Sequence, residues 1–173
     1  MKRDCSVFVA LAAVLLVSTG IVHAAVLASQ NPCAVSGGFC GSIPADGTVL
    51  NIRELKFNAP SIGQALVSVN GSGYCESFAT STVVAEFDTQ IVNKPSTTPS
   101  FSGPGGNKFK FVLPAQTPNA LTGNGVFNLS SQRLFPVRGA GIQRYAINAV
   151  ADRIDSLVTC YITSAALTVL FLP

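Results

Sequence analysis

The stretch Thr82–Val92, with the sequence TVVAEFDTQIV, decides the fold class. Every second residue of this stretch is apolar or β-branched, and the positions between them include Glu86, Asp88 and Gln90. Because successive side chains of an extended strand point to opposite faces, this period of two predicts a strand with one buried face and one wet face. The same period recurs along the chain, whereas the i, i+3, i+4 spacing of helices is nearly absent.

Outward from this stretch, the alternation and the turn residues between the runs predict about eight strands. We expect them at Val49–Phe57, Gln64–Asn70, Thr82–Val92, Lys108–Leu113, Val126–Ser130, Arg133–Val137, Ile142–Ala151 and Leu157–Leu172. Many short strands at this spacing are typical of a single antiparallel β-sandwich, of jelly-roll or Greek-key type. The main alternative within this pattern is a short helix at Ala146–Asp155.

Two departures from strict alternation predict local irregularities. Leu50 and Ile52 lie one residue out of phase with Leu55 and Phe57, so we expect a β-bulge near Arg53-Glu54, or else a single turn of helix there. Asn70-Gly71-Ser72-Gly73 predicts a turn or a bulge.

Connections are marked by Pro, Gly, Asn and Ser. The segment from Asn58 to Gly63 is typical of a hairpin connection, and Gly139–Gly141 marks another turn. The long segments Asn93–Gly106 and Gln116–Asn124 are polar, and long polar loops commonly carry recognition. The alternative interpretation is that they are disordered connectors.

The N-terminus differs from the rest of the chain. Lys2 and Arg3 precede the unbroken apolar run Val7–Val17, and Val22 and Ala24 suit the −3 and −1 positions of a signal-peptidase site. We therefore expect residues 1–24 to be a cleavable signal peptide, residues 25–47 an N-terminal segment with a disulfide loop, and residues 48–173 the β-sandwich. A membrane anchor is the alternative, but the apolar run is short for ~30 Å of hydrocarbon.

Four cysteines would remain after cleavage: Cys33, Cys40, Cys75 and Cys160. An even number behind an export signal favours disulfides, and three pairings are open. We prefer Cys33–Cys40 together with Cys75–Cys160, because the alternation places Cys75 and Cys160 each on the apolar face of a strand. A zinc site is disfavoured because no C-x-x-C pair occurs and no histidine follows the leader.

Composition excludes several classes of partner and of chemistry. Only 11% of the residues are charged and the formal net charge is +3, without a basic stripe, so we expect no nucleic-acid partner. The single histidine, His23, lies in the leader, which excludes Ser-His-Asp and Cys-His catalysis and histidine-ligated metals in the mature chain. We expect no cofactor, no metal and no integral membrane segment in the mature protein.

Carboxylates are the remaining catalytic groups. Glu86 and Asp88 share one strand face, as a glycosidase pair would, but the simpler interpretation is two solvated acids. Asp152 and Asp155 flank Arg153 without the spacing of a calcium loop.

The C-terminal run Leu167–Leu172 is so apolar that it must be buried within a sheet or against a second subunit. The second option makes the chain a possible homo-oligomer. Pilins are similar in size, export and β content, but the ending Val169-Leu170-Phe171-Leu172-Pro173 lacks their penultimate Tyr.

Three functional hypotheses follow. The first is a secreted, periplasmic or cell-surface protein without enzymatic activity, with a role in binding a surface ligand or glycan, in adhesion or in an oligomeric structure. The second is an extracytoplasmic hydrolase that uses carboxylates on glycans. The third is a pilin-like or surface-layer fibre subunit.

Overall fold

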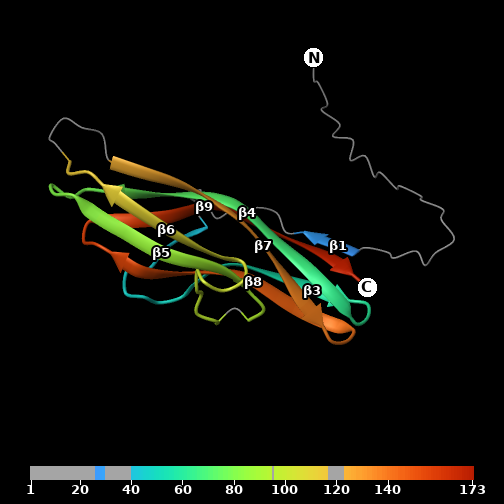
Figure 1. Ribbon diagram of the computed structural model, residues 1–173. Helices are drawn as coiled ribbons and strands as arrows, with labels where there is room; N and C mark the ends of the chain where they lie inside the picture. The colour runs from blue at the N-terminus through green and yellow to red at the C-terminus, as the bar shows by residue number, and fades with distance from the viewer. Residues whose placement is uncertain (1–25, 30–39, 95, 117–122) are drawn as a thin grey trace, which may run out of the picture.

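A computed structural model describes residues 26–29, 40–94, 96–116 and 123–173. The described residues form strands without a helix (Figure 1), so the alternatives of a helix at Ala146–Asp155 and of a helical turn near Arg53 are wrong. The strands are β1 Val26–Ser29, β2 Gly41–Ser42, β3 Leu50–Ala59, β4 Gly63–Ser77, β5 Val83–Val92, β6 Gly106–Leu113, β7 Gly123–Val137, β8 Gly141–Ile154 and β9 Val158–Leu172. In this part of the chain, no helix is long and apolar enough to cross a membrane.

The strands form two antiparallel sheets that pack face to face, which confirms the predicted all-β sandwich. Sheet A has the order β1-β9-β4-β7, and the two-residue strand β2 also pairs with β9. Sheet B has the order β3-β8-β5-β6. Residues 1–24 of the predicted signal peptide lie outside the described residues, as do residues 25 and 30–39 of the predicted segment 25–47.

The order of the strands corrects the predicted hairpin at Asn58–Gly63. β3 belongs to sheet B and β4 to sheet A, so this segment carries the chain from one sheet to the other. The turn at Gly139–Gly141 does the same between β7 and β8. Among the described strands from β3 onward, β5 and β6 are the one consecutive pair that is hydrogen-bonded in the same sheet.

The predicted strand faces are confirmed, because the apolar residues of both sheets point into one shared core. At one side of the sandwich four phenylalanine rings fill the space between the sheets: Phe87 lies 5.1 Å from Phe109, 6.3 Å from Phe111 and 5.1 Å from Phe127, between ring centroids. Phe127 is supplied by sheet A and the other three rings by sheet B. Clusters of this kind join the sheets by apolar burial and by aromatic contacts of about 1 kcal/mol each.

The C-terminal strand is buried within sheet A, which is one of the two options considered for it. β9 lies between β1 and β4, and the side chains of Leu167, Val169 and Phe171 have no exposed surface. The apolarity of β9 is therefore explained without a second subunit.

The disulfide between Cys75 and Cys160 is present, and both residues are fully buried. The two cysteines are direct partners in the β4–β9 ladder, so the bridge links neighbouring strands of one sheet. It closes a sequence separation of 85 residues. The other predicted bridge involves Cys33, which lies outside the described residues, so one disulfide is shown.

Both predicted irregularities are bulges. The β3–β8 register shifts between Asn51 and Arg53, which returns Ile52 and Leu55 to the core. The β4–β9 register shifts between Ser72 and Gly73, where Thr163 of β9 is the extra residue, and β4 itself continues through its two glycines as one strand. A Cβ atom at Gly71 would collide with the carbonyl oxygen of Ser164, which is why that position lacks a side chain.

β7 also differs from the prediction, because the two expected strands Val126–Ser130 and Arg133–Val137 are one. Ser131 and Gln132 were expected to separate them, but both pair with β4 in an unbroken register.

Candidate binding site on the outer face of sheet A

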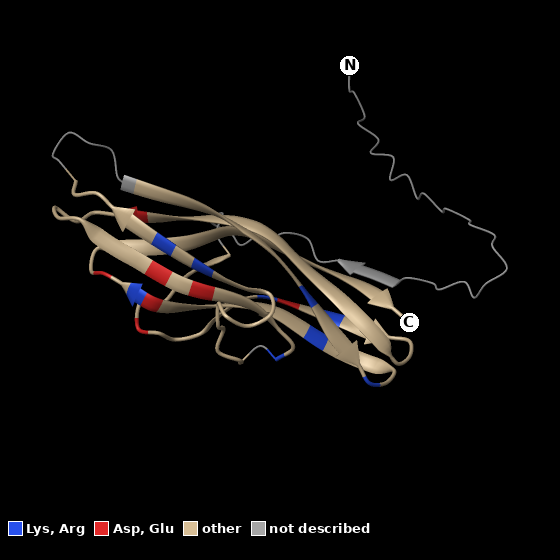
Figure 2. Ribbon diagram, in the orientation of Figure 1, with Lys and Arg blue, Asp and Glu red and all other residues tan. Residues whose placement is uncertain are grey.

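Charge is divided unequally between the two sheets (Figure 2). The strands of sheet A carry Glu76 and Arg133. The strands of sheet B carry Arg53, Glu54, Lys56, Glu86, Asp88, Lys108, Lys110, Arg144, Asp152 and Arg153. Exposed protein surfaces normally carry many charged residues. The outer face of sheet A carries few, which makes it a candidate binding surface.

Arg133 does not contribute to the outer face. It alternates with the exposed residues of β7 and points between the sheets, where its Nη1 donates a hydrogen bond of 2.8 Å to the carbonyl oxygen of Ile91. The guanidinium also lies 4.5 Å from the centre of the Phe135 ring. Burial lowers the pKa of Arg133. Among the described strands of sheet A, Glu76 is therefore the one charged side chain on the outer face.

A pair of tyrosines lies on this face next to the disulfide. The register that pairs Cys75 with Cys160 also pairs Tyr74 with Tyr161, and because side chains alternate, the rings lie on the side opposite the bridge. Their centroids are 5.2 Å apart. Burial, and then the negative charge of Glu76, raise the pKa of Tyr74, so its hydroxyl keeps its proton and can donate a hydrogen bond.

Three hydroxyl groups gather beside the tyrosines, where the bulge brings two successive residues of β9 next to one residue of β4. Ser72 Oγ lies 2.9 Å from Thr163 Oγ1 and 3.0 Å from Ser164 Oγ. Thr163 Oγ1 also donates a hydrogen bond of 2.9 Å to the carbonyl oxygen of Ser72. These bonds hold the hydroxyls in fixed positions.

A hollow of about 400 Å³ opens between these groups. It is lined by Ser72, Gly73, Tyr74, Glu76, Asn124, Val126 and Thr163, from β4, β7 and β9. Its lining thus combines aromatic surface, hydroxyls, one carboxylate and one amide. Such a set can accept and donate several hydrogen bonds to a neutral polar molecule while an aromatic ring packs on its apolar side.

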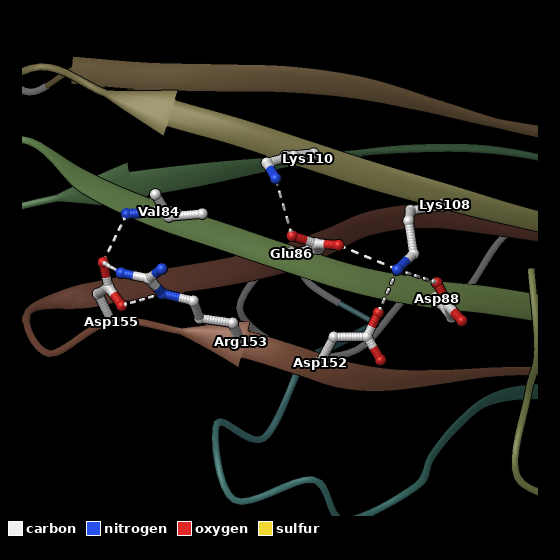
Figure 3. A network of polar contacts seen from close by, with 8 residues as sticks. All are labelled: Val84, Glu86, Asp88, Lys108, Lys110, Asp152, Arg153 and Asp155. Atoms are coloured by element: carbon white, nitrogen blue, oxygen red, sulfur yellow. Dashed lines mark hydrogen bonds and ion pairs between the residues drawn. The ribbon is translucent and has the colours of Figure 1, made fainter.

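The predicted carboxylate pair, Glu86 and Asp88, lies on the other sheet (Figure 3). Lys108 Nζ is 2.9 Å from Glu86 Oε1, 3.8 Å from Asp88 Oδ1 and 2.7 Å from Asp152 Oδ2. Lys110 Nζ is 3.3 Å from Glu86 Oε2. A lysine thus lies among the three acids, which is the arrangement of an ion-pair network on a sheet surface.

The two acids differ in their environment. The hydrogen bonds from Lys108 and from Lys110 lower the pKa of Glu86. Burial raises the pKa of Asp88, although a hydrogen bond from the backbone N–H of Phe101 acts in the opposite direction. The expectation of two solvated acids is wrong for Asp88, which is 6% exposed.

Asp88 is buried because the predicted recognition loop Asn93–Gly106 folds back over sheet B. Ser100 N donates to Gln90 Oε1 at 3.1 Å, and Phe101 N donates to Asp88 Oδ2 at 3.1 Å. Asn148 Nδ2 donates to the carbonyl oxygen of Thr97 at 2.7 Å. These bonds make the described part of the loop a cover for sheet B. Most of the other predicted loop, Gln116–Asn124, lies outside the described residues.

Asp152 and Asp155 do not converge on a common point. Asp155 binds Arg153, at 2.7 Å between Oδ1 and Nε, and accepts a hydrogen bond of 2.8 Å from Val84 N, whereas Asp152 pairs with Lys108. In the part of the chain that the structure describes, no group of three or more metal-ligating side chains occurs.

Sequence reasoning did not single out Tyr74, Tyr161 or Glu76. A signal was present in the segments Tyr74-Cys75-Glu76 and Thr159-Cys160-Tyr161. If a disulfide joins direct partners on antiparallel strands, the residue before one cysteine must lie beside the residue after the other. Under that condition, the predicted Cys75–Cys160 bridge also predicts that Tyr74 lies beside Tyr161.

No protein-family model and no curated protein matches this chain. Among solved structures, that of the infectious bursal disease virus Gx strain is similar to it at 10% identity, with a TM-score of 0.40, over 85% of this chain and 33% of that chain. The VP2 subviral particle of the same virus is similar at 8% identity, with a TM-score of 0.38, over 86% of this chain and 33% of that chain. This chain spans about a third of the length of those chains.

Proposed function

We propose that this protein is a non-enzymatic β-sandwich that works outside the cytoplasm by binding a neutral glycan on the outer face of sheet A. The observation that carries the proposal is the hollow beside Tyr74 and Tyr161 on a face where Glu76 is the one charged side chain of the described strands. The export signal expected at residues 1–24 and the buried disulfide support a location in an oxidising compartment.

A neutral glycan suits the chemistry of this hollow. A sugar ring has an apolar side of C–H groups, which packs on an aromatic ring, and a rim of hydroxyls. Those hydroxyls can pair with Glu76, with the Asn124 amide and with the hydroxyls of Ser72 and Thr163. The described strands of sheet A place no positive charge on this face to pair with an anionic ligand, and they place a single carboxylate, Glu76, to pair with a cationic one.

The order of the strands supports the jelly-roll type within the sandwich class. Counting β1 and β2 as one strand, the first, last, third and sixth strands form one sheet, and the second, seventh, fourth and fifth form the other. This order is that of a jelly roll, an architecture found in lectins and in viral capsids.

The alternative of a carboxylate hydrolase has less support. Lys108 lies between the acids that would have to act as a pair, and the loop 93–106 covers Asp88. The hollow lies on the opposite sheet. A panel of polysaccharides incubated with the purified protein is expected to release no reducing ends.

Binding is tested on an array of neutral oligosaccharides with the purified, labelled protein. Replacing Tyr74 by Ala, or Glu76 by Gln, should weaken binding by roughly fivefold to a hundredfold, since each removes a contact of about 1–3 kcal/mol. Glu54→Gln is the matched control, because Glu54 lies on sheet B and pairs with Arg144. An array without signal, or binding that all three variants retain, would overturn the proposed site.

Location is tested separately. Residues 1–24 are fused to a leaderless reporter in the source organism, and the exported product is sequenced from its N-terminus. We expect export with cleavage after Ala24, and retention of the reporter in the cytoplasm would contradict the proposal.

A further inference from the structure

We infer that two copies of this chain pair through the free edge of β7, along Asn124–Ser130. Within the described part of the chain β7 pairs with β4 alone, so its other edge has no strand partner. The outward residues Asn124, Asn128 and Ser130 are exposed, and Val126 is 73% exposed. An open edge of this kind presents a row of backbone donors and acceptors to another strand.

The other three edges of the sandwich carry features that prevent such pairing. β6 presents Lys108 and Lys110, and β3 presents Arg53, Glu54 and Lys56. β1 is four residues long. Charged side chains and short strands are the usual means by which edges are kept from associating.

β7 has such features only beyond the segment Asn124–Ser130. Arg133 points inward and Pro136 lies near the end of the strand, and both are devices that blunt an edge. Near Arg133 the edge is also covered, because Ser131 Oγ donates to the carbonyl oxygen of Gly105. The seven residues before Ser131 contain no charge and no proline.

The partner that fits this edge is a second copy of the same edge. When the segment pairs antiparallel with itself, every register places neutral side chains opposite each other, so no like charges meet. On its inner side the strand is already packed, because Phe127 and Leu129 are buried and Gly125 lies against the Phe111 ring. Backbone hydrogen bonds therefore supply the contact, and the core does not have to open.

A two-fold axis follows from pairing of identical edges, so the product is a closed dimer and not a fibre. The two copies of sheet A would form one continuous sheet, and Glu76 of each copy would be the one charged side chain that its described strands contribute to the joined outer face. This inference extends the proposed function, since the two hollows would lie on the same side and bind a multivalent surface with increased avidity. The sequence suggested the C-terminal run Leu167–Leu172 of β9 as a contact between subunits, whereas this pairing uses the edge of β7.

The test is light scattering coupled to size exclusion over a range of concentrations, for the unmodified chain and two variants. Asn128→Lys places a charge in the middle of the proposed edge, and we expect the dissociation constant of the dimer to rise roughly tenfold or more. Asn58→Lys is the matched control, because Asn58 is an exposed asparagine on the edge strand β3 of the other sheet. It should remain a dimer.

Hydrogen exchange of the unmodified chain gives a second readout that does not depend on a variant folding. The amides of residues 124–130 should become more protected as concentration rises. A chain that stays monomeric at every concentration, or an Asn128→Lys variant that remains a dimer, would overturn the inference. In either case, glycan binding by a monomer would leave the proposed function standing, whereas a dimer that binds no glycan would leave only the pairing.

Discussion

Removing the Cys75–Cys160 bridge should destabilise the protein mainly by increasing the conformational entropy of the unfolded chain. The bridge closes 85 residues, about half of the chain. In the chain-entropy model a closed loop of this length stabilises the folded state by about 4.6 kcal/mol at 25 °C. A typical domain has a total stability of about 5–15 kcal/mol, so the loss is a large fraction of it.

The assay is equilibrium unfolding in urea, followed by circular dichroism, for Cys75→Ala, Cys160→Ala and the double variant. Each single substitution already breaks the bridge, so the second should add only the smaller cost of removing one more buried sulfur. The losses are therefore expected to be strongly non-additive. The slope of the free energy against urea should increase, because the unfolded chain without its cross-link exposes more surface.

The predicted Cys33–Cys40 bridge offers an internal comparison. Its loop of about seven residues would contribute only about 2.4 kcal/mol in the same model. If the two single losses at Cys75 and Cys160 simply add, or if the slope is unchanged and the loss stays below about 1 kcal/mol, the reasoning from chain entropy is refuted.

Three further predictions concern packing and charge. Gly71→Ala should cost about 1–3 kcal/mol in urea unfolding, because the new methyl group meets the backbone of Ser164, whereas Gly139→Ala, with open space around it, should cost far less; equal effects would contradict this. Glu86→Gln should lower the thermal midpoint at neutral pH and lose this effect in acid, because the lowered pKa of Glu86 gives a stabilisation that disappears as pH falls through that value. Asp88→Asn should be neutral or stabilising at neutral pH, with the difference vanishing in acid, because the raised pKa of Asp88 means that its ionisation opposes folding; a destabilised Asp88→Asn at neutral pH would show that the carboxylate is needed there.

The candidate site was less predictable than the fold. Its residues lie on the wet faces of β4, β7 and β9, where alternation predicts exposure and nothing more. Their proximity depends on the pairing of β4 with β9, two strands that are far apart in the sequence. The predicted Cys75–Cys160 disulfide was the one feature of the sequence that indicated this pairing.

For the acids on sheet B, the sequence predicted the shared face correctly but the exposure of Asp88 wrongly. Alternation placed Glu86 and Asp88 correctly on one face, but it could not show that a loop folds over that face. The burial of Asp88 depends on the hydrogen bonds of Ser100 and Phe101 to β5, which form only when the loop has returned to the strand before it.

The sequence by itself predicted most of the strands and which side of each strand is dry, and it favoured a bulge in β3 and the Cys75–Cys160 pairing over their alternatives. These properties follow from the period of the side chains and from the chemistry of single residues, so they depend on residues that are close together in the sequence. Only the tertiary structure decided which strands are neighbours, which connections cross between the sheets, and that most charged side chains lie on sheet B, with Glu76 as the one charged side chain on the outer face of the described strands of sheet A. Those properties depend on contacts between residues distant in sequence, because the backbone of a strand can pair with any other and the burial of the whole core selects among the arrangements.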